Sequence, residues 1–199
     1  MPKRRGSRAR LATRLACSVL LTLAAACTTD NPPPPPTTTT SSTTTPRPTV
    51  APPVTRTLDL TPVWDSPCGP VSQELLDSMG LRDRGGIHGD RVDTVACIWY
   101  EPRGSLQLDV SFERRDSLGR AYLDSNRPET GVFLPTTVVG QPAVVMGVAP
   151  GAKGLCRVVV GLGPEQGAIV TVSDGNAQGR DSCDEARAAS EQVVRYLGG

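Results

Sequence analysis

The chain has 199 residues, of which 21 are Lys or Arg, 20 are Asp or Glu and one is histidine. Its net charge of +1 is unevenly spread, because six basic residues lie within the first 14 positions and the part from residue 27 onward holds 15 basic against 20 acidic residues. An acidic part of this kind argues against nucleic acid or an anionic lipid surface as the main partner.

The N-terminal segment has the pattern of a secretory signal peptide. Its basic start is followed by an uncharged apolar run from Leu15 to Ala26. That run is shorter than the roughly twenty residues that a membrane-spanning helix needs. A positive region, a short apolar region and a small-residue end are typical of an export signal that is cleaved. We therefore predict a signal peptide over residues 1–26 and exclude it from the fold.

The stretch Leu23-Ala24-Ala25-Ala26-Cys27 resembles the lipobox of bacterial lipoproteins, in which a cysteine directly follows small residues. The resemblance implies that Cys27 carries acyl chains such as palmitate. It would then be the first residue of a mature protein held on the outer face of the cell membrane. The alternative is an ordinary signal peptidase site with an unmodified cysteine beside it.

The lipidated N-terminus and the Pro/Thr-rich stretch after it, residues 27–56, are predicted to form a disordered tether, because this composition cannot build a core. An extended Pro-rich chain rises about 3.1 Å per residue, so the tether can lift a domain away from a membrane. The alternative is a PxxP ligand for a partner domain.

Residues 57–199 are predicted to form one domain, which the hydrophobic pattern and the turn residues divide into helices and strands. In the first half we expect a helix in 68–81, a charged Gly-rich loop in 82–93, strands in 94–102 and 105–114, and a short helix in 116–125. In the second half we expect a strand in 136–148 that is broken at Gly140 and Pro142, and strands in 154–163 and 167–175. A final helix starts with a capping box of Ser182 and Glu185. Hairpins imply an antiparallel sheet, and we expect the helices on one face of it. The predicted class is therefore α+β.

Four cysteines lie in the predicted domain: Cys68, Cys97, Cys156 and Cys183. An even number of cysteines in an exported protein favours disulfides, and the wide spacings lack the close pairs typical of zinc sites. Three pairings are possible. We favour Cys68–Cys97 and Cys156–Cys183, because each closes a loop of near thirty residues and contributes roughly 3 kcal/mol.

Five stretches of the domain resemble a family of four-cysteine cell-envelope lipoproteins of actinobacteria whose domain has no assigned function. These stretches are "DSPCGPVSQELLDSMGL", "ACIWYE", "GQPAVVM", "CRVVVGL" and "SCDEARAASEQVVRYL". The family pattern has a Pro-Cys before a short helix, a Cys-x-Trp strand, a Gly-x-Pro-Ala segment, a Cys-led strand and a Cys before an Ala-rich helix. The resemblance covers roughly residues 60–198 and the lipidated N-terminus. It implies the fold, the disulfides and the location, and it implies no reaction.

The sequence offers little for catalysis. His88 is the only histidine and lies among glycines, which suit a loop residue better than a general base. Asp90 and Asp93 do not form a calcium loop, and "GVAPGAKGL" lacks the spacing of a phosphate loop. We therefore predict no catalytic, cofactor-binding or metal-binding residue.

These features together predict a non-catalytic envelope lipoprotein that binds an unknown envelope protein or small ligand. The domain has only seven aromatic residues, which favours a surface or shallow groove over a large internal cavity. The alternative is a cell-wall hydrolase that uses paired carboxylates.

Overall fold

The computed structural model describes residues 49–88, 92–102, 104–123, 131–147, 154–176 and 181–198, and of residues 83–88 it describes the backbone alone. The predicted signal peptide, Cys27 and the predicted tether as far as residue 48 lie outside these ranges. Within them, no helix is both long and apolar enough to cross a membrane.

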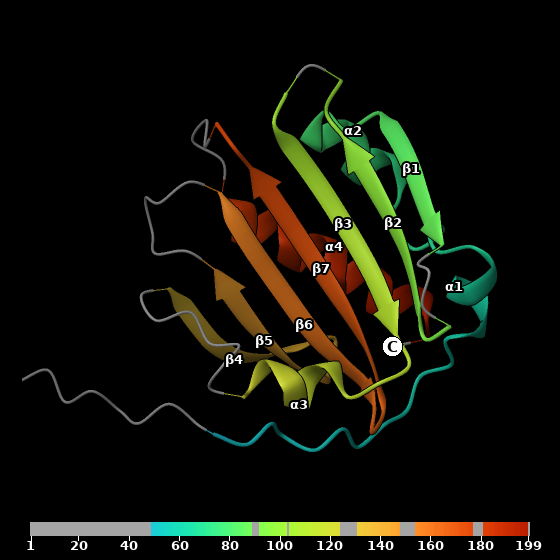
Figure 1. Ribbon diagram of the computed structural model, residues 1–199, viewed down its shortest axis with the longest axis vertical. Helices are drawn as coiled ribbons and strands as arrows, with labels where there is room; N and C mark the ends of the chain where they lie inside the picture. The colour runs from blue at the N-terminus through green and yellow to red at the C-terminus, as the bar shows by residue number, and fades with distance from the viewer. Residues whose placement is uncertain are drawn as a thin grey trace, which may run out of the picture. The chain divides into compact units, whose positions relative to one another are not determined.

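In the described part of the chain, seven strands form one sheet in the order β1-β2-β3-β7-β6-β5-β4, and every neighbouring pair is antiparallel (Figure 1). The strands are β1 (Asp83–His88), β2 (Thr94–Tyr100), β3 (Leu106–Glu113), β4 (Val132–Val138), β5 (Gln141–Gly147), β6 (Leu155–Gly163) and β7 (Gln166–Asp174). The α+β class and the antiparallel sheet that the sequence predicts are confirmed.

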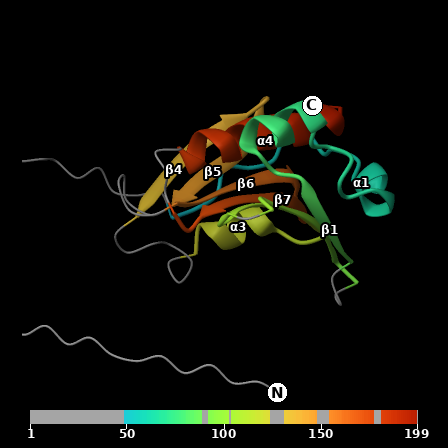
Figure 2. The same cartoon turned by 90° about the horizontal axis from the view of Figure 1, so that it is seen from above.

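The described helices are α1 (Thr61–Asp65), α2 (Gln73–Met79), α3 (Ser117–Ala121) and α4 (Ser182–Tyr196). The longest of them, α4, lies along one face of the sheet, and α3 lies on the opposite face (Figure 2). Helices α1 and α2 contribute Val63, Leu76 and Met79 to the same core as α4. The expectation of helices on one face therefore holds for α1, α2 and α4 and is wrong for α3.

The main core lies between the sheet and α4. Apolar and polar residues alternate along β3, and its apolar row is buried there, with Leu108, Val110 and Phe112 fully inaccessible to solvent. Strand alternation sends the neighbours of this row to the other side of the sheet, as the sequence predicts. Helix α4 packs mainly against β6 and β7, and it adds to this core Ala186, Ala189 and Val193, which recur at helical spacing.

The opposite face has a smaller core of its own, which explains the position of α3. Strands β5 and β6 are apolar on both faces, so Val144, Met146 and Val159 need a cover on the side away from α4. Helix α3 provides it, and Tyr122, just after the helix, makes an edge-to-face ring contact with Phe133 of β4 at a centroid distance of 5.1 Å. The sequence shows only the apolar character of these strands.

Two of the predicted elements are wrong. The Gly-rich segment predicted as a loop forms edge strand β1, in which His88 pairs with Val95. An edge strand can form through main-chain hydrogen bonds alone, so its sequence need not alternate between apolar and polar residues. The predicted broken strand is a tight hairpin of β4 and β5, and its turn residues Val139 and Gly140 both have positive φ, at 47° and 79°. Positive φ at both central residues is the type I′ geometry that suits hairpins.

The domain begins earlier than the predicted boundary at residue 56. Ala51 and Val54 pack against the smaller core, and the Arg56 guanidinium donates to the carbonyl of Gly198. The Leu58 amide donates to the carbonyl of Leu162 at 2.8 Å. Composition places residues 51–56 in the tether, but their apolar side chains and hydrogen bonds belong to the domain.

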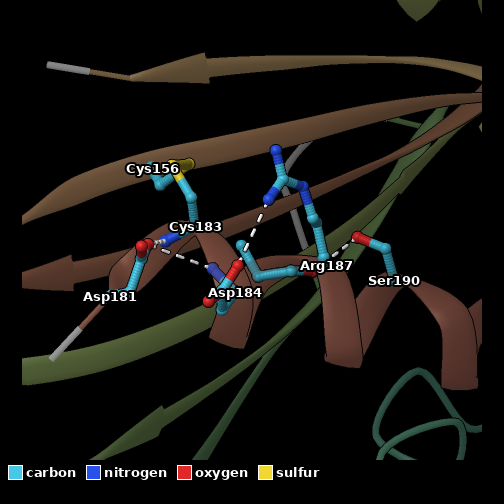
Figure 3. Close-up of a disulfide and its surroundings, with 7 residues drawn as sticks. Cys156, Asp181, Cys183, Asp184, Arg187 and Ser190 are labelled. Carbon is cyan, nitrogen blue, oxygen red and sulfur yellow. Dashed lines mark hydrogen bonds and ion pairs between the residues drawn. A yellow bond between two sulfur atoms is a disulfide. The ribbon is translucent and has the colours of Figure 1, made fainter. Parts of the chain in front are cut away.

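Both favoured disulfides are formed, with Cα–Cα distances of 5.1 Å for Cys68–Cys97 and 5.0 Å for Cys156–Cys183. The second joins the first turn of α4 to β6 (Figure 3). The N-cap of this helix is Asp181, whose carboxylate accepts from the amides of Cys183 and Asp184. The predicted capping box that begins at Ser182 is therefore wrong by one residue.

Candidate functional site

A pocket of about 170 Å³ lies on the α3 side of the sheet, and we call it the α3 pocket. It is lined by the polar residues Glu113, Ser117, Arg120 and Arg157 and by the apolar residues Ala121, Met146, Val159 and Ile169. These residues come from α3 and from strands β3, β5, β6 and β7. The pocket therefore exists only once strands distant in sequence have paired.

One polar wall of the α3 pocket is a fixed ion pair. The Arg115 guanidinium donates to both carboxylate oxygens of Glu113, at 2.9 and 2.7 Å, and the Ser117 hydroxyl donates to the same carboxylate at 2.7 Å. Burial raises the pKa of Glu113, but the hydrogen bonds from Arg115 and Ser117 and the charges of Arg115 and Arg120 outweigh it. The pKa therefore lies below its usual value, and Glu113 stays ionised at neutral pH.

A row of side chains crosses the same face above the pocket. The strand registers place Asp109 of β3, Thr171 of β7 and Arg157 of β6 side by side. The Ser111 hydroxyl donates to Asp109 at 2.7 Å. Burial is the main influence on Asp109 and raises its pKa above the usual value, while the Ser111 hydrogen bond and the Arg157 charge oppose the rise.

Arg157 connects this row to the pocket. Its Nε donates to the Thr171 hydroxyl at 3.3 Å, and its side chain is exposed and lines the pocket. Thr171 therefore fixes the inner edge of the guanidinium. Strand alternation also brings the polar residues Gln107 and Ser173 to this face, so the face combines donors and acceptors with an apolar floor.

The sequence matches a protein family over residues 22–196, and that family is described as "Protein of unknown function (DUF3558)". The chain belongs to the DUF3558 family. The match spans the whole described domain up to Tyr196, and at its other end it begins five residues before Cys27. No curated protein and no solved structure matches the chain.

Of the residues singled out for chemistry, the structure describes the backbone of His88 and the side chain of Asp93 in this DUF3558 domain. His88 ends edge strand β1, and Asp90 lies outside the described residues. Asp93 lies 3.9 Å from the Arg115 guanidinium, at the outer side of the Glu113 ion pair. Across the described parts of the chain, no three His, Cys, Asp or Glu residues cluster as metal ligands.

The α3 pocket itself was missed from the sequence. A partial signal was present, since the alternation of β3 predicts that Asp109, Ser111 and Glu113 face away from the main core, and they do. Nothing local indicates that Arg120 and Arg157, 37 residues apart in the chain, line one pocket.

We expect Asp109→Asn to stabilise the folded DUF3558 domain at neutral pH by up to about 1 kcal/mol. Because the folded-state pKa of Asp109 is raised, the folded chain binds this proton more tightly than the unfolded chain, and the ionised carboxylate lowers stability at neutral pH. That penalty disappears as the pH falls through the folded-state pKa. Urea unfolding between pH 7 and pH 4 should therefore show a gain that shrinks with acidity.

Glu113→Gln is the matched control and has the opposite sign. The pKa of Glu113 is lowered, so its carboxylate stabilises the folded chain above its unfolded-state pKa, and this contribution is lost as the pH falls through the folded-state value. An Asp109→Asn variant no more stable than the wild type at pH 7 would contradict the account of burial at Asp109.

Proposed function

We propose that this protein is a lipid-anchored lipoprotein of the bacterial cell envelope whose domain binds a partner without catalysing a reaction. The observation that carries the anchor is Cys27, which directly follows a short apolar segment and small residues within the stretch matched to the family. The actinobacterial lipoprotein family that the sequence resembles supports the same location, on the outer face of the cell membrane.

The open part of the α3 side supports a binding role. Helix α3 covers its lower part, and none of the other described helices lies in front of the upper strands in Figure 1. Exposed Tyr100 and Leu155 stand at the two sides of this surface, which spans β2, β3, β7 and β6, and polar side chains lie between them. A mixed surface of this kind, with a small pocket at its base, suits a protein segment or a small ligand.

The two carboxylates of this face support binding over the hydrolase alternative. Asp109 and Glu113 lie four residues apart on the same side of β3, and at roughly 3.3 Å per residue their Cα atoms are about 13 Å apart. Glycoside hydrolases place their two carboxyl groups about 5 to 9.5 Å apart and raise the pKa of the acid. Here the pKa of Asp109 is raised and that of Glu113 is lowered, so it is the wide separation of the two carboxylates that argues against the hydrolase.

Site-specific photocrosslinking in intact cells tests the binding role. A photoreactive residue at Leu155, 44% exposed on the α3 side, is expected to capture a specific partner or ligand. The matched control is Tyr196, which is 46% exposed on α4. Capture from position 196 with nothing at position 155 would contradict the proposal, as would the absence of any crosslinked species at both positions.

A further inference from the structure

The Arg157 side chain is the group on the α3 side whose role the fold does not explain. Its Nε is held by Thr171 at 3.3 Å, and within the described residues no hydrogen bond or ion pair engages its two terminal nitrogens. The nearby Arg115 differs, because its guanidinium is engaged by both oxygens of Glu113. Arg157 therefore presents the outer edge of a positively charged group at the pocket.

Asp109 does not neutralise Arg157 by contact. The two residues lie in the same register row but two strands apart, with Thr171 between them. At about 4.8 Å between neighbouring strands, their Cα atoms are roughly 10 Å apart. Arg120 adds a second positive side chain to the pocket lining. The Glu113 carboxylate in the same lining is already bound by Arg115, so Arg115 is not offered to a ligand, whereas the outer edge of Arg157 is.

The strands give the α3 pocket an apolar wall beside Arg157, whose register partner on β5 is Met146. Met146, Val159 and Ile169 supply most of it, and Val159 is almost fully buried. A volume of about 170 Å³ is smaller than the 300 to 1,000 Å³ of sites for drug-sized ligands, so the pocket suits a short group. A planar guanidinium matches the two oxygens of a carboxylate, and an aliphatic chain matches the apolar wall.

We propose that the α3 pocket binds a monocarboxylate that carries a short aliphatic group. Arg157 pairs with the carboxylate, and the chain packs against Met146, Val159 and Ile169. This inference rests on the proposed function as a binding module and names the ligand chemistry. Two sources share that chemistry, namely a free short fatty acid and the C-terminal carboxylate of a peptide that ends in an aliphatic residue.

Methyl NMR of the full chain tests the inference, because the pocket and the main core each contain a methionine. With Met and Ile methyl labels, Met146 and Ile169 report on the pocket, and Met79 in the main core is an internal reference. Sodium hexanoate represents the free acid and N-acetyl-leucine the peptide terminus. Hexanamide and sodium phosphate are the controls without a carboxylate and without a chain.

We expect hexanoate or N-acetyl-leucine to shift Met146 and Ile169 to saturation while Met79 stays in place, with hexanamide and phosphate at least tenfold weaker. Whichever carboxylate binds more tightly identifies the source. Arg157→Gln should weaken binding at least tenfold, and Arg195→Gln, which removes an exposed arginine of α4 paired with Glu191, should leave it unchanged. An unchanged Met79 signal shows that each variant is folded.

Hexanamide or phosphate binding as tightly as hexanoate would overturn the inference, and so would an Arg157→Gln variant that binds like the wild type. The absence of any shift at Met146 and Ile169 with both carboxylates has the same meaning. These outcomes are distinct from failure of the proposed function. If position 155 crosslinks to a partner in cells but neither carboxylate binds, the binding role stands and only this ligand class is wrong.

Discussion

Replacing Cys27 with serine is expected to move nearly all of the protein from the membrane fraction to the soluble fraction. Serine cannot carry the thioether-linked lipid, and each buried CH₂ of an acyl chain contributes about 0.8 kcal/mol to membrane binding. The part of the chain from residue 27 onward is acidic, so it has no charge attraction to an anionic bilayer that would replace the lost chains. Fractionation with mass spectrometry of the N-terminal peptide measures both consequences.

Cys17→Ser is the matched control for this experiment. Cys17 lies ten residues before Cys27, inside the predicted signal peptide that cleavage would remove. Its replacement should therefore leave the amount of protein in the membrane fraction unchanged. If the Cys27→Ser protein fractionated with membranes as fully as the wild type, the anchor would be wrong and the ordinary signal peptidase reading would replace it.

Removing the Cys156–Cys183 disulfide by the double change Cys156→Ala and Cys183→Ala is expected to cost about 3 kcal/mol of unfolding free energy. The bond joins residues 27 positions apart and links the first turn of α4 to β6. Its loss gives the unfolded chain more conformational freedom, which favours unfolding. For a domain of about 150 residues this corresponds to a melting temperature roughly 6 to 12 °C lower. Thermal and urea unfolding followed by circular dichroism give both numbers.

The Cys68–Cys97 pair provides the comparison, because its sequence separation of 29 residues is nearly the same. If restriction of the unfolded chain dominates, the two double alanine variants should lose similar amounts. A loss below about 1 kcal/mol for either variant would contradict the assignment of that bond as a stabilising link. Alanine is used in preference to serine because Cys97 and Cys156 are buried.

The parts of the fold that the sequence predicted depend on local patterns. Strand β3 alternates cleanly between apolar and polar residues, and α4 repeats its apolar residues at helical spacing, so both elements and their buried faces could be recognised. The turn at Pro164 and Glu165 between β6 and β7 was recognisable from its residue types. Each of these signals lies within a few consecutive residues.

The parts that the sequence did not predict depend on contacts between distant residues. Strand β1 forms because the edge of β2 offers main-chain partners, and Gly85 and Gly86 show no sign of it. Helix α3 packs on the second face because β5 and β6 present an apolar surface there. That surface exists only because of the order of the strands in the sheet. The α3 pocket follows from that position of α3, so it could not be recognised before the sheet was known.

The Cys68–Cys97 bond also determines how mechanical load enters the domain. A pull on the N-terminal end first meets residues 51–58, which are held by Val54, by the Arg56 contact to Gly198 and by the Leu58 hydrogen bond. These non-covalent contacts, and then α1, can peel away one after another. At Cys68 the disulfide passes the force directly to Cys97 in β2 and bypasses α2 and β1. The chain between Cys68 and Cys97 therefore cannot extend, and further extension requires β2 to separate from β3.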